Sequence, residues 1–217
     1  MKIKICGLTR CEETDYLNEA KVDYAGFVFY EKSKRNVDLK QAEEIMKQLD
    51  TGIKRVAVTV SPDSNLIERI QNSGFDIIQV HKELGESELD IINIPVWYAV
   101  NISNDDELED KIRMLDSFNE INRNKIKGIV VDAPDFGSGR PFNWKKSKRL
   151  MKAGAQSPPD IISSRDFILA GGLNAANVAE GIKIFNPDVV DVSSSVEGNN
   201  GKDRDRIIEF VNAVRNV

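Results

Sequence analysis

The feature that most constrains the fold is an eightfold alternation of short apolar runs and amphipathic stretches along the 217-residue chain. The apolar runs have the length of strands, and the stretches between them carry apolar residues at helical spacing. The expected strands are Lys2–Gly7, Asp23–Phe29, Lys54–Val60, Asp76–His81, Pro95–Ile102, Lys127–Ala133, Phe167–Gly172 and Val189–Ser194. The expected helices are Glu12–Ala20, Leu39–Leu49, Asp63–Gly74, Glu86–Asn93, Asp105–Asn122, Asn143–Gly154, Asn174–Phe185 and Asp203–Asn216.

A strand followed by a helix, repeated eight times, is typical of a parallel sheet. Several of these strands are apolar nearly throughout, as strands buried on both faces must be. No linker or shift in composition divides the chain, although the segment Ala155–Arg165 has the composition of a surface loop. We therefore expect an α/β protein with a single domain over residues 1–217, folded as a (β/α)8 TIM barrel. An open sheet of eight strands is the structural alternative.

Composition limits the partners and the setting. The formal net charge is −5 and acids and bases are interspersed, which argues against nucleic acid or an anionic membrane as the main partner. The N-terminus alternates lysine with isoleucine from Lys2 to Ile5, and no run has the length of a transmembrane helix. Two cysteines, Cys6 and Cys11, are too few for a disulfide framework, so we expect a cytoplasmic protein. No metal-ligand spacing and no dinucleotide fingerprint occurs, so we expect neither metal nor cofactor.

Small residues end the last two expected strands. Gly171 and Gly172 end one strand, and the next ends in Ser194 and is followed by Ser195. Backbone N–H groups at two neighbouring strand ends, helped by a helix N-terminus, are suited to holding a phosphate. This is also the position at which (β/α)8 barrels most often bind phosphate. The alternative interpretation is that the glycines only permit tight turns.

Two further strand ends carry groups that could transfer protons. Cys6 ends the first strand, where Gly7 allows close backbone approach, although cysteine is often only a small buried hydrophobe. To act as a base it must be a thiolate, which requires nearby positive charge. Asp132 ends the apolar run Ile129–Val131, and partial desolvation there would suit a general acid. The alternative for Asp132 is a helix cap or a partner for Arg140.

Arg35 and His81 are weaker candidates. Arg35 lies in the basic segment Lys32–Arg35, which is either a solvated turn or a clamp for a carboxylate. His81 is the only histidine, and its type and position favour hydrogen bonding at the barrel rim at least as much as catalysis. Together these residues predict a site for a small phosphorylated molecule with a thiolate base and a carboxylic acid. That combination suits proton transfer beside a carbonyl or imine, which is isomerase chemistry.

The motifs at these positions resemble those of the phosphoribosylanthranilate isomerase family of tryptophan biosynthesis. The resemblance runs through the whole chain in order, and its opening Lys-Ile-Cys-Gly and closing Ser-Ser-x-Val-Glu motifs are specific. The matching segments are Lys4–Thr9, Gly26–Phe29, Ser33–Arg35, Gln79–His81, Val131–Asp132, Gly137–Trp144, Leu169–Asn174, Asp191–Glu197 and Gly201–Asp203.

The resemblance implies an Amadori rearrangement of N-(5-phosphoribosyl)anthranilate to 1-(2-carboxyphenylamino)-1-deoxyribulose 5-phosphate. It implies that Asp132 is the general acid that opens the ribose ring and that Cys6 is the general base that removes the proton from C2. Arg35 would bind the anthranilate carboxylate. The substrate-binding residues that it implies are Arg35, His81, Gly137, Gly139, Gly171, Gly172, Ser194 and Ser195. The partner is a small phosphorylated substrate, and the chain is expected to be a monomer or a homodimer.

The chain departs from the family pattern at several positions. Ser195 stands where the family usually has glycine, so it would be strained if that position needs a positive φ. Lys82, Ala133–Pro134 and Phe136 also replace common residues. Three alternatives remain: indole-glycerol-phosphate synthase, ribulose-phosphate epimerase, and a non-catalytic binder of a phosphorylated ligand. The strand ends lack the catalytic lysines of the synthase, and one histidine makes the metal site of the epimerase unexpected.

Overall fold

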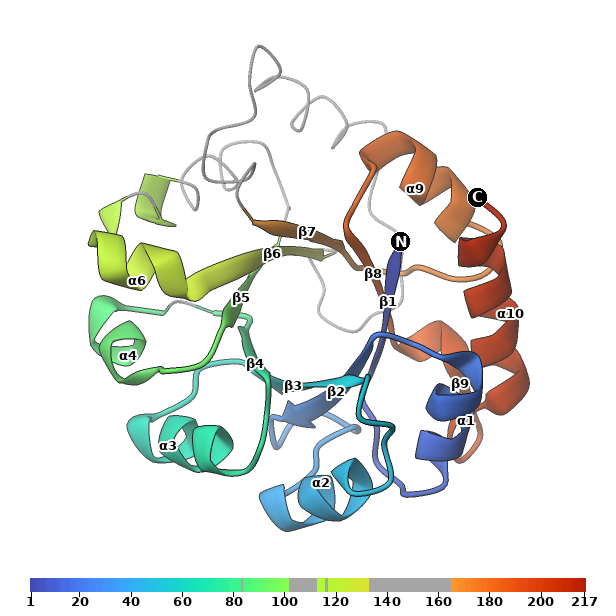
Figure 1. Ribbon diagram of the computed structural model, residues 1–217, viewed down its shortest axis with the longest axis horizontal. Coiled ribbons are helices and arrows are strands. Elements are labelled where there is room, and N and C mark those ends of the chain that lie inside the picture. Colours follow the sequence, from blue (N-terminus) through green and yellow to red (C-terminus); the bar gives the residue numbers. More distant parts are fainter. Residues whose placement is uncertain (83, 102–112, 116, 133–164) are drawn as a thin grey trace.

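The computed structural model shows a closed barrel of eight parallel strands (Figure 1). It describes residues 1–82, 84–101, 113–115, 117–132 and 165–217. The strands are β1 (Lys2–Cys6), β2 (Tyr24–Phe29), β3 (Lys54–Thr59), β4 (Ile77–Val80), β5 (Val96–Asn101), β6 (Ile126–Asp132), β7 (Asp166–Leu169) and β8 (Val189–Val192). Closure is made by β1 and β8, whose register pairs Lys4 with Asp191 and Ile5 with Val192. The predicted TIM barrel is confirmed, and the open sheet is excluded.

Helices surround the barrel in Figure 1. They are α1 (Glu13–Ala20), α2 (Leu39–Met46), α3 (Ser64–Asn72), α4 (Glu86–Ile91), α6 (Glu120–Lys125), α9 (Val178–Phe185) and α10 (Arg204–Arg215). Local sequence explains several of their ends. Asp38, Asp63 and Asp203 each cap a helix by accepting a hydrogen bond from the backbone N–H three residues later. Lys21 and Asn186 end α1 and α9 in the left-handed conformation.

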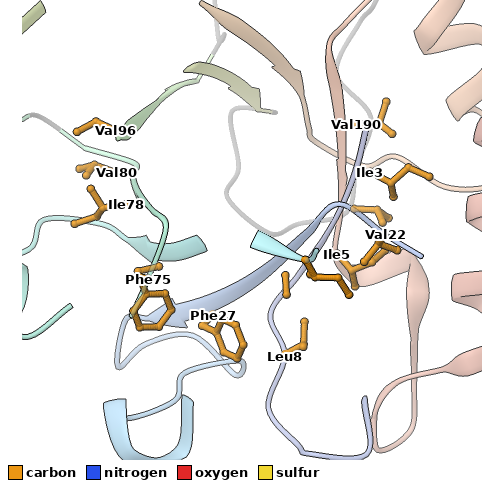
Figure 2. Packing of buried hydrophobic residues seen from close by; sticks show 14 of the residues in the cluster. Ile3, Ile5, Leu8, Val22, Phe27, Phe75, Ile78, Val80, Val96 and Val190 are labelled. Atoms are coloured by element: carbon orange, nitrogen blue, oxygen red, sulfur yellow. The ribbon is translucent and has the colours of Figure 1, made fainter. Parts of the chain in front are cut away.

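Side chains alternate between two apolar cores, as the pleat of each strand requires. One core lies outside the barrel, between strands and helices, and Figure 2 shows part of it around Ile3, Ile5 and Val190. The other core fills the barrel interior and includes Tyr24 and Trp97, whose ring centroids are 4.9 Å apart. These two rings lie near the amino-terminal ends of their strands, so the interior is filled at that end. Space for a ligand is left at the carboxyl ends.

The structure also differs from the expected elements. Most of the helix expected over Asp105–Asn122 lies outside the described residues. A bend at Phe118 interrupts its described part, and a separate helix, α6, follows, whose N-terminus is capped because the Asn119 side chain accepts a hydrogen bond from the N–H of Asn122. Beyond β8 lies a 3-10 helix, η1 (Ser194–Val196), and then a hairpin of β9 (Glu197–Gly198) and β10 (Gly201–Lys202). The helix expected over 143–154 lies outside the described residues, as does all but the last residue of the loop expected over 155–165.

Across the described parts of the chain, every helix is too short or too polar to span a bilayer.

Candidate active site

A cavity of about 410 Å³ opens at the carboxyl ends of the strands. Its lining includes seven of the residues expected from the sequence to form the site, and they come from six different strands or the loops that follow them. These residues are Cys6, Arg35, His81, Asp132, Gly171, Gly172 and Ser194. Gly137 and Gly139 lie outside the described residues. The structure therefore brings the proposed base, acid, carboxylate clamp and phosphate loops to one place.

Cys6 ends β1 at the floor of the cavity, where it is a free thiol and only 9% exposed. Burial raises the pKa of this thiol, while the charge of Lys4 opposes that rise. Asp191 raises the pKa further, and Lys202 lowers it. The backbone around the thiol is held because the Ser193 hydroxyl donates a 2.8 Å hydrogen bond to the carbonyl of Cys6. The positive charge that a thiolate base requires is therefore present near Cys6. Its lowering effect on the pKa of the thiol is smaller than the raising effect of burial.

A buried ion pair lies beside Cys6. The ammonium of Lys4 is 2.7 Å from Asp191 Oδ2, and the side chains of Lys4 and Asp191 are 0% and 8% exposed. Their positions are paired directly in the register of β1 and β8. Sequence reasoning missed this pair, although both residues interrupt apolar strands and Lys4 lies two residues before Cys6. A spacing of two places both side chains on one face of the strand.

Arg35 is bound by a partner that the sequence did not reveal. Its guanidinium donates from Nε to Glu197 Oε1 and from Nη2 to Glu197 Oε2, the second distance being 3.1 Å. The same carboxylate contacts Lys34 at 2.8 Å and Lys202 at 2.9 Å. Burial would raise the pKa of Glu197, but Arg35, Lys202 and Lys34 lower it to about 2. Arg35 is only 12% exposed, so it is a fixed group at the cavity edge and not part of a solvated turn.

Gly7 explains why Arg35 can lie so close to β1. Its φ is +88°, and a Cβ added there would lie 2.5 Å from Cδ of Arg35. Glycine therefore satisfies both the backbone conformation and the space that the arginine side chain occupies.

His81 is partly buried and takes part in hydrogen bonds. Its Nε2 lies 2.7 Å from Nε2 of Gln79, and its backbone N–H donates to the carbonyl of Thr59. Burial, with the charge of Lys4, lowers the pKa of His81 to about 3. The ring is therefore neutral near pH 7, which favours the hydrogen-bonding interpretation over acid–base catalysis.

Asp132 ends β6 and lines the cavity with its side chain partly exposed. Its position is paired with Asn101 of β5, and β7 continues the sheet on its other side. The end of an apolar strand thus contributes a carboxyl group to the lining of the cavity.

The loops after β7 and β8 meet at the cavity as expected. Gly171 and Gly172 have φ values of +83° and +69°, and within the described chain their N–H groups donate no hydrogen bond. Unpaired N–H groups at a strand end suit an anion. Ser194 lines the same cavity.

The prediction of backbone strain at Ser195 is wrong. Among the described residues, the non-glycine positions with positive φ are Lys21 and Asn186, so Ser195 is not one of them. Ser195 lies in the 3-10 helix η1, where a negative φ suits any residue. Its hydroxyl donates a 2.6 Å hydrogen bond to the carbonyl of Leu173, which joins the loops after β7 and β8.

No cluster of three or more histidine, cysteine, aspartate or glutamate side chains in the described residues has the arrangement of a metal site.

The closed barrel, with a cavity at its carboxyl face that contains several ionisable side chains, defines a (β/α)8-barrel enzyme. Residues 3–213 match the model of the family described as N-(5'-phosphoribosyl)anthranilate (PRA) isomerase. The chain belongs to this family, and it is an isomerase.

Relatives agree with this assignment over their full lengths. N-(5'-phosphoribosyl)anthranilate isomerase of Thermoanaerobacter pseudethanolicus is 37% identical over 223 residues, which cover 100% of this chain and 99% of the relative. A crystal structure of phosphoribosyl anthranilate isomerase in complex with reduced 1-(o-carboxyphenylamino)-1-deoxyribulose 5-phosphate has a TM-score of 0.80 at 29% identity, with 100% of both chains covered. A crystal structure of monomers generated from the dimeric isomerase of Thermotoga maritima has a TM-score of 0.80 at 31% identity, again with 100% of both chains covered.

Proposed function

We propose that this chain catalyses the rearrangement of N-(5-phosphoribosyl)anthranilate to 1-(2-carboxyphenylamino)-1-deoxyribulose 5-phosphate in tryptophan biosynthesis, with Cys6 as general base and Asp132 as general acid. The observation that carries the proposal is the meeting of Cys6, Asp132, Arg35 and the unpaired N–H groups after β7 in one cavity. Membership of the isomerase family supports the reaction.

The two ends of the substrate are both anionic, and the cavity offers a distinct group for each. Backbone N–H groups of Gly171, Gly172, Ser194 and Ser195 hold the 5-phosphate. Arg35 binds the anthranilate carboxylate through the guanidinium edge that Glu197 does not occupy, since Glu197 takes Nε and one side of Nη2. The ribose then lies across the cavity, between Cys6 and Asp132. His81, Gly137 and Gly139 complete the proposed set of binding residues.

The reaction needs one acid and one base in sequence. Asp132 donates a proton to the ribose ring oxygen, and the ring opens to an imine. Cys6, as a thiolate, removes the proton from C2, and the resulting enolamine tautomerises to the ketone. Each such proton transfer contributes on the order of 10²–10⁴ to the rate.

The non-catalytic binder loses its main support. The expected strain at Ser195 was the feature that favoured it, and Ser195 adopts an ordinary conformation. Lys4, one of the lysines of the first strand, is paired with Asp191 in the barrel interior and gives no support to the synthase.

Turnover tests the proposal directly. Purified protein is mixed with N-(5-phosphoribosyl)anthranilate, and loss of the anthranilate-type fluorescence is followed. We expect turnover in the parent chain and in a Cys11→Ser control, and rescue of growth in a tryptophan-requiring strain that lacks this isomerase. Binding of a reduced product analogue without turnover or rescue would identify a binder and contradict the proposal.

The remaining assignments are proposals on the same basis. We infer a single domain over residues 1–217, since β1 and β8, near the two ends of the chain, pair to close the barrel. A small phosphorylated substrate is the proposed partner. The choice between monomer and homodimer and the cytoplasmic location stay predictions.

A further inference from the structure

The buried amine of Lys4 lies beneath the thiol of Cys6. Both side chains point into the barrel from β1, two residues apart, and Lys4 is 0% exposed. Cys6 and Asp191 line the cavity, whereas Lys4 lies behind them. The charge of the Lys4 ammonium lowers the pKa of the thiol and so opposes the effect of burial. Lys4 can therefore act on the reaction only through groups that line the cavity, and its charge acts on Cys6, Asp191 and His81.

Asp191 competes with Cys6 for this ammonium. Its Oδ2 accepts a 2.7 Å hydrogen bond from Lys4, while its buried Oδ1 has no hydrogen-bond partner among the described residues. A buried ion pair with an unsatisfied oxygen adds little or nothing to stability, because desolvation offsets the attraction. A role in the chemistry of Cys6 therefore explains the Lys4–Asp191 ion pair better than a role in stabilising the fold.

Other charged groups also face Cys6. Lys202 of β10 contributes positive charge, but its ammonium is bound by Glu197 and by the carbonyl of Ser193 at 3.1 Å. The remaining ionisable groups that line the same cavity are Lys32, Lys34, Arg35, His81, Lys82 and Asp132. Lys4 differs from these groups because it lies two residues before Cys6 on the same face of β1, and its charge lowers the pKa of the thiol.

We propose that Lys4 is a positioning residue that stabilises the thiolate of Cys6, and that Asp191 limits this stabilisation by sharing the ammonium. The inference rests on the proposed role of Cys6 as base. The thiol loses its proton to solvent in the open cavity, and Lys4 stays protonated throughout. When the thiolate takes the C2 proton it becomes a neutral thiol again, and Lys4 returns fully to Asp191.

Alkylation of Cys6 by iodoacetamide as a function of pH tests this without any substrate. The Cys11→Ser background leaves Cys6 as the only thiol in the chain. In it we expect Lys4→Met to raise the pH midpoint of alkylation by about one unit or more, and so to slow the reaction roughly tenfold near pH 7. Asp191→Asn is expected to move the midpoint in the opposite direction. Lys54→Met, at the exposed start of β3, is the matched control and should leave it unchanged.

The double variant Lys4→Met/Asp191→Asn keeps the test valid if Lys4→Met fails to fold, because it leaves no unpaired buried charge. It should react more slowly than the parent. Two outcomes would show that the ion pair is merely structural and would overturn the proposal. One is an unchanged pH midpoint of alkylation in the double variant, and the other is a midpoint that rises in Asp191→Asn as it does in Lys4→Met. Absence of isomerase turnover in the parent would instead overturn the proposed function, whatever the alkylation shows.

Discussion

Glu197 is the residue whose replacement most directly tests the electrostatics of the cavity edge. Its carboxylate contacts Lys34, Arg35 and Lys202, and two of these cations are nearly buried. Glu197→Gln keeps the shape of the side chain and removes its charge. We expect the variant to lose stability and to bind a reduced product analogue more weakly, because Arg35 is no longer held in place.

The size of the stability loss follows from the pKa of Glu197. Its value of about 2, against an ordinary 4.5, corresponds to about 3 kcal/mol of unfolding free energy for a solvent-excluded carboxylate. Glu197 is 11% exposed and one of its partners, Lys34, is 72% exposed, so solvent screening reduces this to roughly 1–2 kcal/mol. Because the folded pKa is lowered, the stabilisation is complete above pH 4.5 and is lost as the pH falls towards 2.

Urea unfolding of the parent and Glu197→Gln at about pH 7 and about pH 3 measures both effects. The difference between the two proteins should fall to less than half at the lower pH. Glu19→Gln is the matched control, since Glu19 also pairs with an arginine but is 47% exposed, and it should change little. Equal stability of parent and Glu197→Gln at pH 7, or a difference that does not shrink at low pH, would refute the reasoning.

Three further predictions concern single residues of the site. The one histidine, His81, should stay neutral from about pH 5 to 8, because burial and Lys4 hold its pKa at about 3; an NMR titration of the ring with a midpoint near 6.5 would contradict this. Gly7→Ala should cost about 1–2 kcal/mol of unfolding free energy and weaken analogue binding, since φ is +88° and the added Cβ meets Arg35; calorimetry that finds both unchanged would exclude the close contact. Ser195→Ala should cost about 1 kcal/mol, because the carbonyl of Leu173 loses its donor; an unchanged urea midpoint would show that this bond is absent.

The barrel could be predicted because each strand is a short apolar run bounded by polar or turn residues. Observed strand limits lie within three residues of the expected ones, and the largest error is at β7, which ends at Leu169 and not at Gly172. The break before α6 was missed, although Asn119 carries an N-cap signal, because the polar pattern continues through it. The hairpin of β9 and β10 is too short to leave a periodic pattern.

The site could be predicted only where a strand end carries an unusual residue type. Cys6, Asp132 and the two glycines met that condition. Lys4, at the centre of β1, and Glu197, in β9, did not meet it. The importance of Lys4 depends on barrel closure, which brings β8 to β1, and that of Glu197 depends on the approach of β9 to the loop that carries Arg35. Ser195 shows the reverse case: sequence comparison suggested strain, and the 3-10 helix removes it.

The central claim is that Cys6 and Asp132 are the base and the acid of one isomerase site. The most direct test is kcat for Cys6→Ser and for Asp132→Asn, measured by the loss of anthranilate-type fluorescence and set against binding of the reduced product analogue. We predict that kcat falls by at least about a hundredfold in each variant while the affinity for the analogue changes little. Turnover within about a factor of two of the parent in either variant would contradict the account.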